Sequence, residues 1–175
     1  MRHFEQPKSG FTLLELIVVL AIIGMLSALI IPRLSSIGLA QLRSEARRIR
    51  SLIQACYDLS VLEKTNYRLA INLDEQCIEP QQRQADRYEP VQNPLLQRHC
   101  LAPEVTIQEF ETPDRKIAGA GEDYLYFTPF GYVEPARIFI TDTSGNSFTL
   151  FTQPLTGEVE IFAGRVEFKD YEEQR

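Results

Sequence analysis

The sequence predicts an α+β protein in which one long N-terminal helix packs on an antiparallel β-sheet or a small β-sandwich. An unbroken apolar run at residues 11–31 is followed by apolar residues at helical spacing up to residue 63, and later segments show the period of two that is typical of half-buried strands. The 175 residues, of which 44% are hydrophobic and 24% charged, suffice for one globular domain with one long extra element.

The N-terminal segment divides into a short polar stretch and a long apolar one. Residues 1–10 read MRHFEQPKSG, and residues 11–31 read FTLLELIVVLAIIGMLSALII, in which Glu15 is the only charged residue. As a helix, the apolar stretch would extend about 32 Å, close to the thickness of the hydrocarbon core of a bilayer. It is longer than the apolar core of a secretory signal, which has about 7–15 residues. We therefore expect residues 11–32 to span a membrane and to stay attached; cleavage near Ile37-Gly38-Leu39-Ala40 is the alternative.

Pro32 ends the apolar run, and because proline removes a helical hydrogen bond we expect a kink or local melting between Gly24 and Pro32. Residues 33–63 are predicted to form a second, amphipathic half of the helix. Its apolar residues recur at steps of four and three, which places them on one stripe: Leu42, Ala46, Ile49, Ile53 and Cys56. The opposite side carries Arg43, Arg47, Arg50, Gln54 and Asp58.

The β domain, residues 64–175, is predicted from the alternation of apolar and polar residues. The expected strands are 66–73, 105–110, 124–128, 137–141, 147–152, 159–163 and 165–168, with DTSGN and PLTG as turn sequences between the later ones. Residues 80–103 are rich in Gln, Pro and Arg and have few periodic apolar positions, so we expect a long surface loop there.

The three cysteines, Cys56, Cys77 and Cys100, form no CxxC pair, which argues against a zinc ribbon or a redox motif. Cys56 lies on the apolar stripe and is expected to be a small buried side chain. In an oxidising compartment, a Cys77–Cys100 disulfide would fix the ends of the polar stretch between them; free buried thiols are the alternative.

The net charge of −6 argues against a nucleic-acid partner, since such proteins usually carry a basic face. With only two histidines, His3 and His99, neither a multi-histidine metal site nor histidine-based catalysis is expected. The acidic runs at 122–123 and 170–173 are typical of solvated faces. The sequence therefore predicts no cofactor and no enzymatic activity.

The N-terminus resembles the prepilin segment of type IV pilins and type II secretion pseudopilins. A short basic leader ends in Lys8-Ser9-Gly10, the sequence Phe11-Thr12-Leu13-Leu14-Glu15 follows, and an unbroken apolar helix contains Gly24 and Pro32. The resemblance implies that a prepilin peptidase cuts between Gly10 and Phe11 and methylates the new amine of Phe11. A glycine at the junction lets the protease approach the backbone closely.

The resemblance also implies that Glu15 acts in assembly. A charge at membrane depth costs about 2.5–3.5 kcal/mol on insertion scales. When neighbouring helices stack with an axial offset of about one turn, Glu15 of one subunit can pair with the Phe11 ammonium of the next, so that pairing favours the filament. The alternative is an acid that reaches the membrane surface from a position near the helix end.

A second, partial resemblance covers residues 126–162 and points to GspH-type pseudopilins and FimT-type minor pilins. An aromatic-x-Pro-x-Gly element, here Phe127, Pro129 and Gly131, precedes a strand pair. Thr156-Gly157-Glu158-Val159 then closes the sheet, with Glu158 where the family commonly has Arg. From the residues alone these are turn positions, and Phe127, Phe130 and Tyr132 are expected in the core.

The resemblance implies a single-pass protein of the bacterial inner membrane with a cytoplasmic N-terminus and a periplasmic C-terminal domain. The positive-inside rule alone gives the opposite orientation, because two basic residues precede the helix and five follow it closely: Arg2 and Lys8, then Arg33, Arg43, Arg47, Arg48 and Arg50. We follow the resemblance, since the peptidase needs the leader in the cytoplasm.

The expected function is that of a minor pseudopilin, a structural subunit of the periplasmic pseudopilus of a type II secretion system. Its partners would be the prepilin peptidase, other pseudopilins or pilins, the inner-membrane assembly platform and membrane lipid. A minor pilin of a type IV pilus, acting in pilus priming or DNA uptake, is the close alternative. Removal of the leader takes the net charge from −6 to −7, which argues against DNA. A membrane-anchored periplasmic enzyme is the third alternative.

Overall fold

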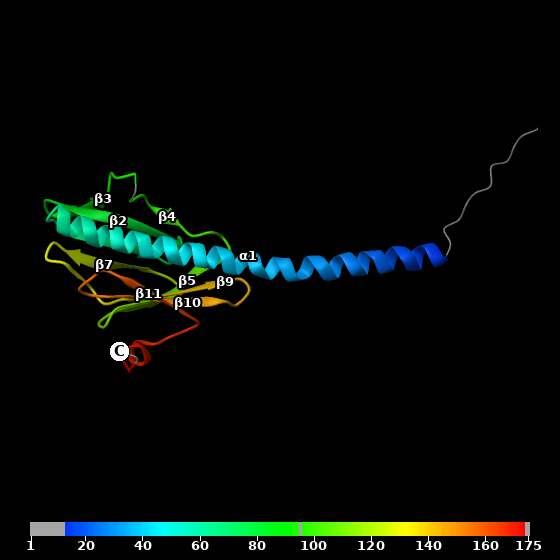
Figure 1. Ribbon diagram of the computed structural model, residues 1–175. Helices are drawn as coiled ribbons and strands as arrows, with labels where there is room; N and C mark the ends of the chain where they lie inside the picture. Colours follow the sequence, from blue (N-terminus) through cyan, green and yellow to red (C-terminus); the bar gives the residue numbers. More distant parts are fainter. Residues whose placement is uncertain (1–12, 95, 174–175) are drawn as a thin grey trace, which may run out of the picture. The chain divides into compact units, whose positions relative to one another are not determined.

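The structure is a computed structural model that describes residues 13–94 and 96–173, with side chains described except at 26–37, 172 and 173. The chain divides into two units, residues 1–37 and residues 38–175. Helix α1 (Leu13–Leu62) has residues in both units, whereas all the described strands and the short helix α2 (Phe168–Glu173) belong to the second (Figure 1). The expected α+β class is confirmed.

The second half of α1 is amphipathic as predicted. Each of the five stripe residues from Leu42 to Cys56 is at most 1% exposed. On the opposite side Arg43, Arg47 and Arg50 are exposed. α1 is helical through both Gly24 and Pro32, and the kink expected between them stays a prediction.

The strands form two antiparallel sheets. The first has the order β3-β2-β1-β7-β8, with β4 paired to β2, and the second has the order β11-β10-β9-β5-β6. The strands of the first sheet are β1 (Tyr67–Asn72), β2 (Cys77–Gln84), β3 (Arg87–Pro90), β4 (His99–Cys100), β7 (Glu122–Thr128) and β8 (Tyr132–Val133). Those of the second are β5 (Val105–Glu111), β6 (Lys116–Ala118), β9 (Arg137–Asp142), β10 (Ser147–Thr152) and β11 (Val159–Ala163). Six of the seven strands expected from the sequence are therefore confirmed.

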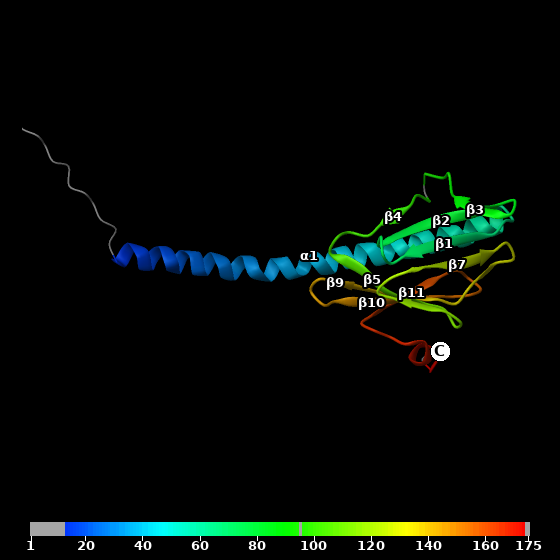
Figure 2. The ribbon, with the colours of Figure 1, turned by 180° about the vertical axis from the view of Figure 1, so that it is seen from behind.

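The core of the second unit lies where the stripe of α1 meets the inner faces of both sheets. In Figure 1, α1 runs in front of β2, and in Figure 2, seen from behind, β1 and β2 lie in front of the helix. One cluster of buried side chains joins the α1 stripe with Leu69 and Ile71 of β1 and with Ile138 and Ile140 of β9. Alternate residues of each strand contribute to this cluster because side chains on a strand point to opposite faces in turn.

The turn DTSGN, residues 142–146, connects β9 to β10 and packs against α1. Asp142 accepts hydrogen bonds from the backbone amides of Ser144 and Asn146, at 2.9 and 2.8 Å. A Cβ at Gly38 would lie 3.0 Å from Asp142 Oδ2, so the missing side chain lets the turn approach the helix. Gly38, in the stretch considered as an alternative cleavage site, therefore belongs to a packed helix.

The prediction of a surface loop at 80–103 is wrong for its first part, where β2 and β3 form a hairpin. Gln82 pairs with Glu89, and Arg83 with Tyr88, across the two strands. The tight turn uses Ala85 at φ +54°, a position at which the sequence gives no glycine signal. β3 is an edge strand with a mostly exposed, polar surface, so its backbone pairing leaves no alternation of apolar residues to detect.

The prediction of a strand at 165–168 is also wrong, because the chain leaves the sheet after Ala163 and then forms α2. α2 covers the outer face of the second sheet through aromatic contacts. The rings of Phe151 and Tyr171 are stacked with centroids 4.2 Å apart, and Phe168 meets Phe151 edge to face at 5.4 Å. β9 and β10 are consequently buried on both faces, which is unusual for an antiparallel sheet.

The C-terminal segment is also held by an ionic network around Arg137, the largest fully buried side chain. Arg137 Nη2 lies 2.7 Å from Glu109 Oε2 and 3.3 Å from Glu167 Oε2, and it also pairs with Glu111. Arg165 binds Glu109 at 2.7 Å and Glu167 at 2.8 Å. Removing one acid from such a network leaves a buried guanidinium undercompensated, which is strongly destabilising.

Acid should loosen this segment. Burial of Glu109 opposes its ionisation, but hydrogen bonds from Arg165 and Arg137 outweigh that effect and hold the pKa of Glu109 below its usual value. A carboxylate with a lowered folded-state pKa stabilises fully above its unfolded pKa, about 4.3, and the stabilisation is lost as the pH falls through the lower folded-state value. We expect the urea concentration at the midpoint of unfolding to decrease when the pH is lowered below about 5. In Glu109→Gln this decrease should be smaller, because the titrating carboxylate is absent.

The matched control is Glu104→Gln, which replaces an exposed acid outside the network. Its urea midpoint should fall with acid as the wild-type midpoint does. An acid dependence of Glu109→Gln as steep as that of the wild type would contradict the role given to the network.

Candidate assembly site

The first turns of α1 present apolar side chains on every side. From Leu13 to Met25 the only charged residue is Glu15, and Leu13, Leu14 and Met25 are each at least 73% exposed. A helix that is apolar all round needs a nonpolar environment, in a membrane or among other helices. This segment is therefore a candidate for burial against lipid or partner helices.

Glu15 lies in the first turn of α1. A carboxylate there is favoured by the partial positive charge at the helix N-terminus, typically by about 0.3–1 kcal/mol. The two residues of the expected cleavage junction, Gly10 and Phe11, lie outside the described residues. Within the described part of the chain, no helix is both long and apolar enough to cross a membrane.

Tyr57 of α1 joins the two loops that contain the C-terminal motif residues. Its hydroxyl donates to the Leu155 carbonyl oxygen at 2.6 Å and lies 3.2 Å from the Gly131 carbonyl oxygen. One turn further along the helix, the hydroxyl of Ser60 lies 3.1 Å from the Thr128 carbonyl oxygen. We call this arrangement the Tyr57 clasp. Nothing in the sequence indicated this arrangement, because a tyrosine on a helix is usually a packing residue.

The clasp explains why glycine stands at position 157. Gly157 has φ +68°, and a Cβ there would lie 2.3 Å from Tyr57 Cγ. Gly131, at φ +76°, would place a Cβ 3.3 Å from the Tyr57 hydroxyl. Both motif glycines therefore let a loop approach the same tyrosine.

The expectation that Phe127, Phe130 and Tyr132 lie in the core is correct only for the first. Phe127 is 1% exposed, whereas Phe130 is 93% and Tyr132 43% exposed. Phe130 stands between Pro129 and Gly131 in the turn between β7 and β8, and the turn directs its ring away from the core. Aromatic character alone does not reveal on which side of a turn a side chain lies.

Cys77 and Cys100 form a disulfide between β2 and β4, where the two residues are direct register partners. The bond ties the end of the segment 91–100 to the first sheet. Cys56 is a free, fully buried thiol, and burial raises its pKa to about 12, which keeps it protonated and unreactive.

The segment before Cys100 is also bound to α1 through His99. His99 Nε2 lies 2.6 Å from Glu45 Oε2, and the backbone amide of Ala102 donates to Glu45 Oε1 at 3.3 Å. The single histidine of the β domain is thus a structural partner of the helix. The sequence left Glu45 unassigned because its spacing from His99 carries no local signal.

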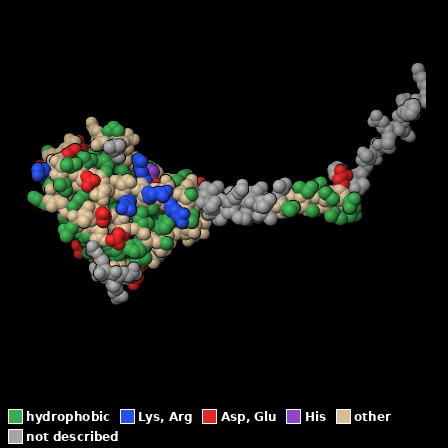
Figure 3. Space-filling model, viewed as in Figure 1, with side chains coloured by type: hydrophobic (Ala, Val, Ile, Leu, Met, Phe, Trp, Pro, Cys, Tyr) green, Lys and Arg blue, Asp and Glu red, His purple; other side chains and the backbone are tan. Residues whose placement is uncertain are grey.

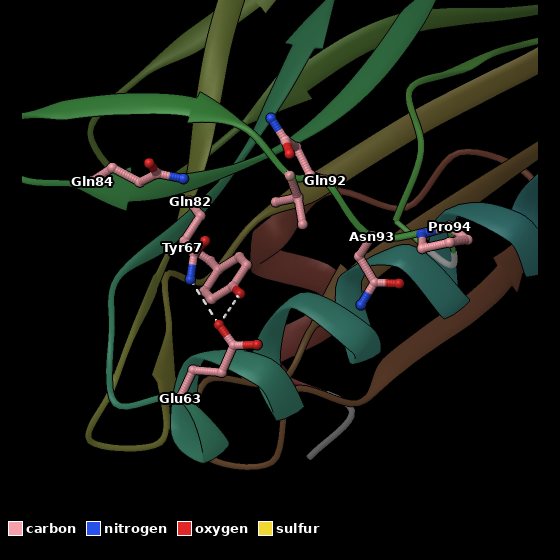
Figure 4. A pocket seen from close by; sticks show the side chains of 8 residues that line it. Glu63, Tyr67, Gln82, Gln84, Gln92, Asn93 and Pro94 are labelled. Carbon is pink, nitrogen blue, oxygen red and sulfur yellow. Dashed lines mark hydrogen bonds between the residues drawn. The ribbon is translucent and has the colours of Figure 1, made fainter.

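A polar pocket lies where the end of α1 meets β1, β2 and the segment 91–94 (Figure 4). Glu63 is its only acid, and its carboxylate accepts hydrogen bonds from the Tyr67 hydroxyl at 2.6 Å and from Gln82 at 2.7 Å. Burial and the hydrogen bond to Glu63 raise the pKa of the Tyr67 phenol, so the tyrosine stays neutral at physiological pH. The pocket is lined by neutral amide side chains and by one carboxylate, whose Oε2 accepts both of these hydrogen bonds.

Three of the acids considered for an enzymatic alternative have partners within the fold. Asp123 pairs with Arg115 at 2.9 Å, and Glu122 accepts from the Tyr124 hydroxyl at 2.6 Å. Asp170 accepts a hydrogen bond from the backbone amide of Glu167 at 3.4 Å. Among the described residues, no three His, Cys, Asp or Glu side chains are grouped as metal ligands would be.

Comparison with known families identifies the N-terminal segment. Residues 6–31 match the prokaryotic N-terminal methylation motif. No curated protein matches the chain in sequence.

The fold of the chain is similar to those of two solved minor subunits. The minor pseudopilin EpsH from the type II secretion system of Vibrio cholerae is 16% identical, with a TM-score of 0.58 over 70% of this chain and 97% of that one. A second structure of EpsH is 15% identical, with the same TM-score over 73% of this chain and 98% of that one. The type IV minor pilin FimU of Pseudomonas aeruginosa is 14% identical, with a TM-score of 0.51 over 72% of this chain and 94% of that one. At these identities the likeness establishes the fold.

Replacing Gly157 by Ala should destabilise the protein more than replacing Gly145 by Ala. Both glycines have positive φ, which costs an alanine about 1–2 kcal/mol, but only Gly157 lies against a ring. Overpacking adds about 1–3 kcal/mol, so we expect a loss of about 3 kcal/mol in Gly157→Ala and about 1 kcal/mol in Gly145→Ala. Urea unfolding of both variants measures the difference, and equal losses would contradict the clasp.

Loss of the disulfide should destabilise the β domain. The two cysteines are 23 residues apart, and closing a loop of that length stabilises by about 3 kcal/mol on the chain-entropy model. We expect Cys77→Ser/Cys100→Ser to lose about that much relative to the wild type. The control is the reduced wild-type protein, which should unfold at the midpoint of the double variant. A variant as stable as the oxidised wild type would contradict a stabilising bond.

Proposed function

Because this chain is type IV pilin-like in both its N-terminal motif and its fold, we propose that it is a minor pseudopilin of a type II secretion system. In this role it is a structural subunit of a short periplasmic filament and catalyses no reaction. The observation that carries the proposal is the exposed apolar segment Leu13–Met25 with Glu15 in its first turn, inside the residues that match the N-terminal methylation motif.

The proposed assembly depends on processing of the N-terminus. The prepilin peptidase cleaves between Gly10 and Phe11 and methylates the Phe11 amine, which keeps its positive charge. In the filament this amine pairs with Glu15 of the neighbouring subunit. A charge at membrane depth costs about 2.5–3.5 kcal/mol, so a pairing that neutralises two charges favours the assembled state.

The proposed location follows from the same segment. Residues 11–32 anchor the chain in the inner membrane with the leader in the cytoplasm, and residues 33–63 and 64–175 form the periplasmic part. The disulfide between Cys77 and Cys100 is compatible with that oxidising compartment. The other partners in this proposal are further pseudopilins, the inner-membrane assembly platform and membrane lipid.

A minor pilin of a type IV pilus is the second candidate, and the fold similarity to FimU supports it. We rank it second because the TM-score is higher for the minor pseudopilin, 0.58 against 0.51. A role in DNA uptake has less support, since the chain carries a net charge of −6. Enzymatic activity has the least support, because Asp123 is paired with Arg115 and Glu122 accepts a hydrogen bond from Tyr124.

The test follows processing and assembly of the full chain in its bacterial host. Mass spectrometry of the mature protein should find N-methylated Phe11 as the first residue, and cells without prepilin peptidase should retain residues 1–10. Glu15→Leu should insert and be processed normally but be depleted from sheared filaments by about tenfold or more, because it lacks the charge that meets the amine. The control variant is Glu104→Leu, which removes an exposed acid of the β domain.

Two outcomes would contradict the proposal. A mature chain that begins elsewhere than Phe11 would remove the basis of the filament role. Deletion of the gene should also stop secretion through the type II system while surface pili persist; loss of pili with intact secretion would establish the second candidate instead.

A further inference from the structure

The stretch of sequence that follows the apolar segment concentrates positive charge. Residues 33–57 contain five arginines and one acid, Glu45, so this stretch has a net charge of +4. The whole chain has a net charge of −6, which leaves −10 for the remaining residues. Four of the arginines lie on the part of α1 that belongs to the second unit, and we call them the arginine face: Arg43, Arg47, Arg48 and Arg50.

All four side chains of the arginine face are exposed, and none of them forms an ion pair among the described residues. Figure 3 shows basic side chains gathered over the part of α1 that follows Gly38. Because the apolar stripe on the other side of the helix is buried by the two sheets, the arginine face is the side of α1 that remains open to another surface.

The acids close to the arginine face in the chain have other partners. Glu45 lies 2.6 Å from His99 Nε2 and accepts a hydrogen bond from the backbone amide of Ala102 at 3.3 Å. Asp58 accepts a hydrogen bond from Gln54 at 3.2 Å, and it lines a depression together with Arg50. The other three arginines of the face therefore depend on water or on another molecule for their counter-charge.

The arginine face has no apolar centre. From residue 38 to residue 60 of α1, none of the large apolar side chains is exposed. Contacts between proteins depend mainly on apolar or aromatic side chains buried at the centre of the interface, whereas anionic lipid headgroups attract basic residues by charge alone. A guanidinium group also binds phosphate through two parallel hydrogen bonds. The composition of the face therefore favours a phosphate-bearing surface over a protein.

The position of the face in the chain limits how far it can lie from a membrane. Arg43 follows Ile31, the last residue of the apolar segment, by twelve residues. α1 is helical between them, and twelve helical residues rise by about 18 Å. A helix that leans toward the membrane surface would shorten this distance, and the kink expected at Pro32 would provide the bend.

We propose that the arginine face binds the headgroups of anionic phospholipids at the membrane surface and holds the subunit there before assembly. The guanidinium groups donate hydrogen bonds to the lipid phosphate oxygens. The same surface repels the rest of the chain with its net charge of −10, so the charge distribution turns the arginine face toward the membrane. Entry into a filament breaks this contact, and release of the subunit therefore depends on the anionic lipid content.

This inference rests on the proposed function, which anchors residues 11–32 in the inner membrane and places the arginines in the periplasm. The positive-inside rule gives the opposite orientation because of these arginines. Binding to the headgroups of the periplasmic leaflet gives them a role on that side.

The experiment uses the full-length chain reconstituted in vesicles of phosphatidylcholine alone or of phosphatidylcholine mixed with phosphatidylglycerol. A fluorophore is attached to Ser44→Cys, an exposed position beside the face. Cys56 is buried and the other two cysteines form the disulfide, so the label is confined to residue 44. A trace lipid with a nitroxide on its headgroup quenches the fluorophore when the two come into contact.

The test variant is Arg43→Gln/Arg47→Gln/Arg48→Gln. Its matched control makes the same change in net charge at three exposed basic residues away from the face that form no ion pair among the described residues: Lys64→Gln/Arg87→Gln/Lys169→Gln. Both variants carry the label at residue 44.

In the unsubstituted chain and in the control, quenching should be stronger with phosphatidylglycerol and should weaken as the salt concentration is raised. An arginine near an anionic surface favours the bound state about fivefold, so the test variant should lower the ratio of bound to free domain on the order of a hundredfold. Its quenching should then be the same in both kinds of vesicle.

Equal quenching of the unsubstituted chain in both kinds of vesicle would overturn the proposal. A test variant that still responds to phosphatidylglycerol as the control does would overturn it too. Duplex DNA that binds the unsubstituted chain in phosphatidylcholine vesicles, but not the test variant, would identify nucleic acid as the occupant and also overturn it.

The proposed function and the lipid contact fail in different ways. If the chain enters filaments in the host but its quenching does not depend on anionic lipid, the lipid contact is wrong and the filament role stands. If the quenching depends on anionic lipid as expected but the chain never enters filaments, the filament role is wrong and the lipid contact stands.

Discussion

The covering of one long apolar helix is the constraint on which the rest of this protein depends. In the second unit, the stripe from Leu42 to Cys56 is buried by the inner faces of two antiparallel sheets. In the first unit, the described side chains from Leu13 to Met25 are apolar and exposed apart from the acid Glu15. Because exposed apolar surface is unfavourable in water, the second unit is a folded domain by itself, whereas the first needs lipid or other helices.

Charged groups follow the same division between internal and external partners. The guanidinium of Arg137 is fully buried and is compensated inside the chain by Glu109, Glu111 and Glu167. Arg43 and Arg47, on the outer side of α1, form no ion pair among the described residues and are exposed to water, where the cost of a charge is small. The buried ion pairs of Arg137 hold the C-terminal segment in place. The exposed arginines of α1 remain available to other molecules.

The turn residues fix the two loops that lie beside the end of α1. Gly131 and Gly157 let two loops approach Tyr57, and the tyrosine fixes the loops through their carbonyl oxygens. Between these fixed points the chain directs Phe130 and Leu155 outward.

The sequence by itself determined the elements in which one face is buried: the amphipathic half of α1 and six strands, because burial on one side leaves a period in the apolar residues. It also located the glycine turns and the apolar segment that contains Glu15. The polar hairpin of β2 and β3, the covering of β9 and β10 by α2, and the exposure of Phe130 were decided only by the tertiary structure. Each depends on a neighbour distant in the chain, and a contact of that kind leaves no periodic trace in the local sequence.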